Sequence, residues 1–207
     1  MATSPLDAAP PTFSMLLPEA WQQIDFDPET RDESIERMIR RTVGQADALV
    51  PVRRWAVDTY GRLLADAETT GIFFGANFTG ELGGRILSAS VLAFVTDLPL
   101  AEDGYPMSPR ALAAALAHPD NDDEQTVEPP QVVELHVGTS VRTRTRLRVR
   151  PAGAVSGVPE VEAVRFFTPV SEWRLMLVIT FSTPVLSAAG AFAELFDSLA
   201  ATARWKD

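Results

Sequence analysis

The carboxyl-terminal stretch, residues 173–207, constrains the fold more than any other part of this sequence. It opens with the nearly uninterrupted apolar run WRLMLVITFS, which predicts a strand buried on both faces. Thr183-Pro184 then ends the strand, and apolar residues recur at helical spacing from Val185 to Ala203. A buried strand that leads directly into an amphipathic helix predicts a core in which a helix packs on a sheet.

Most of the remaining apolar segments alternate with period two and are separated by turn residues. The predicted strands are 13–17, 21–25, a hairpin over 71–95 that turns at Gly80-Glu-Leu-Gly-Gly, 131–150 divided at Gly138, and 160–168. Short links between successive strands favour antiparallel pairing.

Three helices are predicted before the closing one. Two form a helical pair over 28–69, and the first of these carries the i,i+4 pairs Glu33–Arg37 and Glu36–Arg40 on its solvent side. The third runs from Arg110 to Ala117 after the capping sequence Ser108-Pro109. The predicted fold class is therefore α+β, with a central antiparallel sheet flanked by helices and an inserted N-terminal helical pair.

The length and composition predict one domain. A chain of 207 residues can bury a sizeable core, so we expect a single α+β domain over 12–207. Residues 1–11 hold three prolines among small residues and predict a disordered tail. We see no signal peptide, and the longest apolar run, 86–95, is about half of what a membrane span needs. We therefore expect a soluble, cytoplasmic protein.

The sequence carries no recognisable catalytic or metal-binding motif. There is no Cys and there are two His, which excludes disulfides, Cys-based zinc sites and multi-His metal sites. The glycines at 80–84 fit neither a dinucleotide fingerprint nor a P-loop, and the acidic segment 120–124 lacks the Gly and Glu that a calcium loop requires. A net charge of −10 opposes general nucleic-acid binding. We predict no enzyme activity, no cofactor and no metal.

One feature stands out against this acidic background. Between Glu134 and Glu160 there is no acidic residue, and arginine occupies every second position at Arg142, Arg144, Arg146, Arg148 and Arg150. On a strand these side chains share a face at intervals of roughly 6.6 Å. They either bind an anion, carboxylate or phosphate, or they cover apolar surface and pair with acids of a neighbouring strand such as Glu160 and Glu162.

His136 joins this set as a candidate binding residue. Strand alternation places it on the arginine face, two residues after Glu134. A His–Glu pair can transfer protons, but no nucleophile motif such as GxSxG or SxxK accompanies it. A structural role is the more economical interpretation.

Two ends of the chain resemble a known family. The pattern Phe13-x-x-x-x-Pro18-x-x-Trp21 resembles the entry strands of the PsbP-like superfamily. Further residues are similar to actinobacterial proteins, some of them similar to ones encoded near secretion loci: Ile24-Asp25, Asp27-Pro28, Thr30-Arg31, Phe181-Ser-Thr-Pro184, Phe196-Asp197 and Trp205. The resemblance implies an α/β/α sandwich that binds other macromolecules, as LpqN-type lipoproteins and Eag-type secretion chaperones do. The helical pair at 28–69 and the lack of a lipobox Cys depart from that pattern.

These observations predict a non-enzymatic protein-binding adaptor or chaperone-like module linked to bacterial secretion. Its partner is expected to be a protein with an acidic surface or a secreted effector, without nucleic acid or a membrane span. Two alternatives stay open. The chain could be a small anionic-ligand-binding protein or an enzyme that uses the arginine face, or a structural subunit that assembles through residues 28–69.

Overall fold

The computed structural model describes residues 12–24, 71–101, 104–118, 122–148 and 160–206, with Phe26, Thr30, Glu33, Ser34, Glu36, Arg37 and Arg40. The predicted tail 1–11, most of the helical pair 28–69, and Arg150 lie outside the described residues. The isolated positions from Glu33 to Arg40 are helical, and both predicted ion pairs form, with Arg37–Glu33 at 4.0 Å and Arg40–Glu36 at 2.8 Å.

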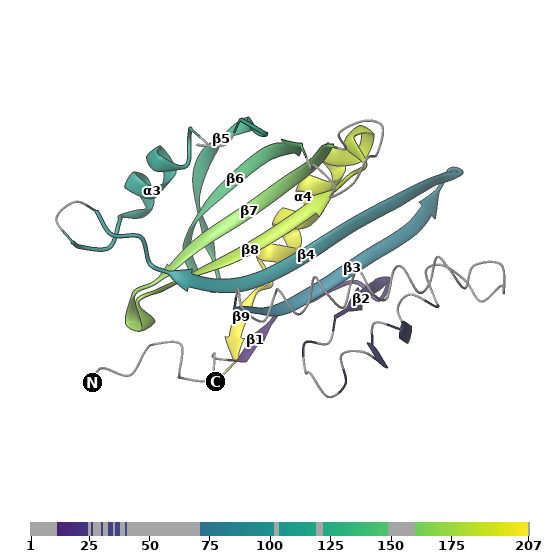
Figure 1. Cartoon of the computed structure of the whole chain (residues 1–207), viewed down its shortest axis with the longest axis horizontal. Coiled ribbons are helices and arrows are strands. Elements are labelled where there is room, and N and C mark those ends of the chain that lie inside the picture. The colour runs from purple at the N-terminus through teal and green to yellow at the C-terminus, as the bar shows by residue number, and fades with distance from the viewer. Residues whose placement is uncertain are drawn as a thin grey trace. The chain divides into compact units, whose positions relative to one another are not determined.

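The described residues form an α+β structure that is mostly antiparallel sheet (Figure 1). The strands are β1 (Thr12–Ser14), β2 (Trp21–Gln23), β3 (Ile72–Leu82), β4 (Arg85–Asp97), β5 (Glu124–Leu135), β6 (Gly138–Arg148), β7 (Glu160–Val170), β8 (Leu175–Thr183) and β9 (Arg204–Lys206). The helices are α3 (Pro109–Ala115) and α4 (Ala189–Ala200), with short 3-10 turns η3 (Ser171–Trp173) and η4 (Leu186–Ala188). The chain divides into two compact units, Met1–Leu17 with Val95–Asp207, and Pro18–Phe94.

The larger unit is built on four antiparallel strands in the order β8-β7-β6-β5, with α4 packed on one face. Phe181 of β8 stacks on Phe196 of α4 at 4.9 Å between ring centroids, and Phe192 stacks on Phe196 at 5.6 Å. The apolar periodicity of the closing helix therefore marks its buried face, as predicted. Thr183 ends β8, and its Oγ1 accepts a hydrogen bond from Val185 N.

The two chain ends of the larger unit meet in a small sheet of their own. β1 pairs antiparallel with β9, which places Phe13 opposite Trp205. The Trp205 ring meets Phe13 edge-on at 5.6 Å and Trp173 at 5.1 Å. Aromatic packing of this kind stabilises a short strand pair that its few hydrogen bonds alone would not hold.

Helix α3 begins where the sequence places it. Ser108 caps it by accepting a hydrogen bond from Ala111 N at 3.2 Å, and Pro109 occupies the first turn, where its missing N–H costs nothing. Leu112 is its buried residue. The helix lies against β5 and β6.

The smaller unit is dominated by the predicted hairpin. Gly83 and Gly84 join β3 to β4 with φ of +59° and +76°, a conformation that L side chains rarely adopt and that tight hairpin turns require. β2 extends the pair to three strands, and Trp21 stacks on Phe78 at 6.0 Å. Ala76 and Val91 face each other on the buried side.

β5 departs from the prediction. It begins at Glu124, in the segment expected to be an acidic loop, and continues through Pro129-Pro130. The two prolines are tolerated there because β5 is the last strand in the order and because they lie at an irregularity in its register with β6. The first two strands, β1 and β2, are shorter than predicted.

Candidate binding site: the arginine ladder

Four of the five predicted arginines lie on one face of β6. Their partners across β7 are Phe166 for Arg142, Val164 for Arg144, Glu162 for Arg146 and Glu160 for Arg148. We call Arg142, Arg144, Arg146 and Arg148 the arginine ladder. α4 packs on the same face, because Asp197 of that helix contacts Arg142.

The inner half of the ladder, Arg142 and Arg144, is buried in ion pairs. The Arg142 side chain is 8% exposed, and it donates from Nε to Asp197 at 2.7 Å and from Nη1 to Glu128 at 3.0 Å. The Arg144 side chain is 15% exposed and also pairs with Glu128. Its Nε and Nη2 both reach Glu162 Oε1, at 2.6 and 2.5 Å. The inner half therefore joins β5, β6, β7 and α4 through charge-assisted hydrogen bonds.

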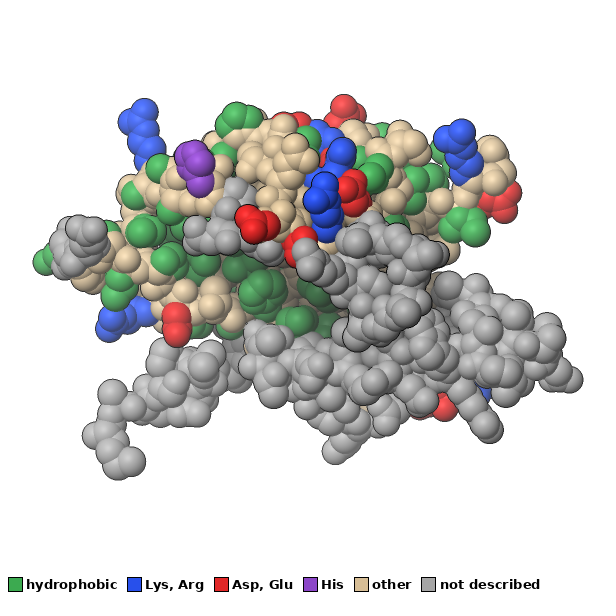
Figure 2. Space-filling view, turned by 45° about the horizontal axis from the view of Figure 1, so that its top comes forward, with side chains coloured by type: hydrophobic (Ala, Val, Ile, Leu, Met, Phe, Trp, Pro, Cys, Tyr) green, Lys and Arg blue, Asp and Glu red, His purple; other side chains and the backbone are tan. Residues whose placement is uncertain are grey.

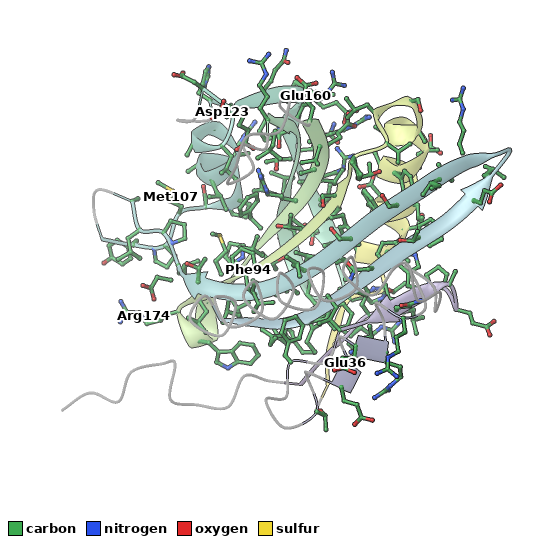
Figure 3. All side chains as sticks on the ribbon, turned by 45° about the vertical axis from the view of Figure 1, so that its right-hand side comes forward. Glu36, Phe94, Met107, Asp123, Glu160 and Arg174 are labelled. Carbon is green, nitrogen blue, oxygen red and sulfur yellow. The ribbon has the colours of Figure 1, made fainter. Side chains whose placement is uncertain are left out.

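The outer half, Arg146 and Arg148, is more exposed and makes longer hydrogen bonds. Arg146 is 37% exposed and donates from Nη2 to Glu162 at 3.3 Å, while its buried Nε has no hydrogen-bond partner in the described structure. Arg148 is 61% exposed and donates to Glu160, also at 3.3 Å. Figure 3 shows Glu160 at the same end of the larger unit as Asp123, whose carbonyl accepts from Arg148 N.

The ladder pairs with acids of β7. This matches the second of the two alternatives from the sequence, in which the arginines pair with acids of a neighbouring strand. Glu160 and Glu162 both take part, and Glu162 is only 3% exposed. The inner arginines are not solvated, however, because two strands and a helix enclose them. On the face shown in Figure 2, basic and acidic side chains are interspersed instead of gathered by sign.

Glu128 reaches the ladder because β5 is bulged. Thr126 pairs with Thr145 but Glu128 pairs with Arg144, so Val127 is an extra residue without a partner in the register. Such a bulge moves the following side chain to the other face of the strand. In a regular strand Glu128 would lie opposite Thr143, on the face where Glu124 pairs with Arg165. The bulge thus brings Glu128 to the ladder, where it pairs with Arg142 and Arg144.

The pKa of Glu128 reflects its position beside Arg142 and Arg144. Burial alone raises the pKa of its carboxyl, but hydrogen bonds and charge from Arg142 and Arg144 outweigh burial and hold that pKa below its usual 4.5. For Arg142 and Arg144, burial lowers the pKa, and hydrogen bonds and charge from their acidic partners more than offset this. All three groups are therefore held in their charged forms.

We expect the ladder to make folding sensitive to acid. Because the pKa of Glu128 is lower in the folded than in the unfolded chain, its stabilisation is complete above about pH 4.5 and is lost as pH falls through the folded value. Thermal unfolding midpoints measured from pH 7 to pH 3 should fall more steeply for the parent than for Glu128→Gln. Parallel curves for the two proteins would show that Glu128 is not part of this acid response.

His136 and Glu134 do not form the pair that alternation predicted. A two-residue turn joins Leu135 to Gly138, so from Gln131 to Leu135 the even-numbered residues of β5 share a face with odd-numbered residues of β6. Glu134 is consequently on the face opposite the ladder, where its carboxylate accepts from Thr139 Oγ1 at 2.9 Å. His136 is exposed in the turn, and its Nδ1 lies 2.5 Å from the carbonyl oxygen of Ala201, just after α4.

Comparison with known proteins assigns no family to this chain. No protein-family model matches this chain, and no curated protein is significantly similar to it in sequence. Within the part of the chain that the structure describes, no helix is both long and apolar enough to cross a membrane. The same residues include no group of three or more acidic or histidine side chains placed to hold a metal ion.

Proposed function

We propose that this chain is a non-enzymatic protein-binding module of PsbP-like architecture, with its sheet between helical layers, that acts in the cytoplasm as an adaptor or chaperone-like protein linked to bacterial secretion. Its partner presents an acidic segment, and the outer half of the ladder, Arg146 and Arg148, contacts that segment. The observation that carries the proposal is the difference between the two halves of the ladder.

The inner half has no capacity to exchange partners. Arg142 and Arg144 are enclosed and hold three acids among them, so a competing carboxylate would have to displace short, buried ion pairs. The Arg146 side chain is 37% exposed and that of Arg148 is 61% exposed, and their hydrogen bonds to Glu162 and Glu160 are longer, at 3.3 Å. The Arg148–Glu160 pair is exposed, and such a pair contributes only about 0–1 kcal/mol, so exchange of Glu160 for a carboxylate on a partner costs little. A guanidinium group can also donate two parallel N–H hydrogen bonds to one carboxylate, which suits it to an acidic partner.

A protein partner accounts for this arrangement better than a small anion does. Two half-paired arginines on an exposed strand face offer a small ligand few free donors, and tight small-ligand sites usually enclose most of the ligand. A protein brings further contacts over a wide area, so each charge pair can be weak. The third possibility, assembly through residues 28–69, concerns a segment that lies mostly outside the described residues.

The test is capture of partners from a lysate of the source organism with an Arg146→Gln/Arg148→Glu variant beside the parent. Glu162 keeps Arg144 in this variant, so folding should persist, which circular dichroism verifies. Partners of the parent should be lost from the variant, and should also elute with salt because exposed charge pairs are screened over about 8 Å.

Arg110→Glu provides the matched control, since it reverses an exposed charge on α3 away from the ladder. It should retain the full partner set. Identical partners for the parent and the ladder variant would remove the outer half from the proposal. Release of the partner by millimolar inorganic phosphate, with direct binding of phosphate to the parent, would favour the small-anion alternative.

A further inference from the structure

β5 forms the free edge of the larger unit's sheet. It has one neighbour, β6, and Figure 1 shows no described strand beyond it. Two of its large apolar side chains, Val127 and Val132, are exposed. A strand of this length with exposed valines is a template on which another strand can pair, because its outward N–H and C=O groups have no partner strand.

The natural partner for such an edge is a second copy of the same strand. Antiparallel self-pairing of β5 about the centre of Glu124–Leu135 brings Val127 of one copy opposite Val132 of the other. Cross-strand pairs of β-branched residues stabilise a sheet. In this register Glu128 faces Gln131, so no like charges are opposed. The valine pairs therefore favour self-pairing, and the midpoint of the strand opposes it.

Pro129 and Pro130 occupy the midpoint of β5. Neither proline has an N–H to donate, so a strand that pairs across this midpoint finds no backbone donor at either residue. Pro129-Pro130 also stand opposite Thr143 alone, which is a second bulge directly after the one at Val127. Bulges bend and twist an edge away from the flat shape that pairing needs.

We infer that the segment from Val127 to Pro130 prevents the β5 edge from pairing with a second copy of this chain. It is independent of the proposed function at the ladder. The first bulge also has a second effect, because it directs Glu128 to Arg142 and Arg144. In self-pairing, the prolines of the two copies would meet at the symmetry axis, where their effect on both strands is greatest.

The test restores the missing donors with Pro129→Thr/Pro130→Val. The molar mass, measured by light scattering during size-exclusion chromatography, should rise with concentration toward twice that of the parent, which keeps its own mass. Adding Val132→Lys to the variant should return it to the parental mass, because a charged residue on an edge opposes pairing. Pro106→Val, an exposed proline outside the sheet, is the control and should not change the mass.

A folded double variant with the parental mass at every concentration would overturn the inference. Association that Val132→Lys does not reverse would also overturn it, because the contact would then lie elsewhere. Pro129→Ala/Pro130→Ala restores the same two N–H groups with smaller side chains, and it carries the test if the first variant does not fold. Circular dichroism and a cooperative thermal transition establish folding for each protein.

Discussion

Replacing Phe196 by alanine is expected to lower the free energy of unfolding by about 3–5 kcal/mol. Phe196 is fully buried and stands between the rings of Phe181 and Phe192, so it joins α4 to β8. Truncation removes apolar area from the core and leaves a cavity that rigid strands on one side cannot fill. The larger unit should lose a substantial part of its stability.

Urea denaturation followed by circular dichroism measures this loss. The midpoint should fall for Phe196→Ala, whereas Ile86→Ala, which truncates an exposed side chain on the hairpin, should change stability by no more than about 0.5 kcal/mol. An unchanged midpoint for Phe196→Ala would contradict the packing of α4 on the sheet.

The parts of the fold that the sequence predicts well are those fixed by local pattern. The spacing of Phe192 and Phe196 identifies the buried face of α4 without knowledge of what it packs against. Gly83-Gly84 identifies the hairpin turn because few other residues accept the required φ. Ser108-Pro109 marks the start of α3 for a similarly local reason.

The sequence predicts two of the acids that pair with the ladder, Glu160 and Glu162, but not Glu128 or Asp197. Glu128 faces the arginines only because Val127 is bulged, and Glu134 faces away because the turn after Leu135 has two residues. Both effects depend on strand register, which alternation within one strand does not specify. Asp197 is distant in sequence and reaches Arg142 through the packing of α4.

The start of β5 illustrates the same limit. Pro129-Pro130 is a strong signal against a strand when it is judged alone, and the predicted strand begins just after it, at Gln131. The signal weakens if the strand is known to be at an edge, because one side then needs no donors. Edge position is a property of the whole sheet. It becomes visible only after β6, β7 and β8 have been ordered.

Arg144→Met is expected to destabilise the larger unit by about 3–5 kcal/mol, because it leaves a buried carboxylate without its principal partner. Glu162 is almost fully buried, and its remaining contact would be Arg146 at 3.3 Å. Arg148→Ala is the matched control from the outer half, and loss of its exposed pair should cost no more than about 1 kcal/mol.

A double-mutant cycle separates the charge from the packing. If the penalty comes from the unpaired carboxylate, Arg144→Met/Glu162→Met should recover much of the stability lost in the single variant, because both charges are then replaced by apolar side chains. Urea unfolding at pH 7 gives the four free energies that the cycle requires. Additive effects of the two substitutions would show that the ion pair itself is not what holds β6 to β7 at this position. Strong coupling would establish the inner half as structural, and would leave Arg146 and Arg148 as the arginines of this face that a partner can use.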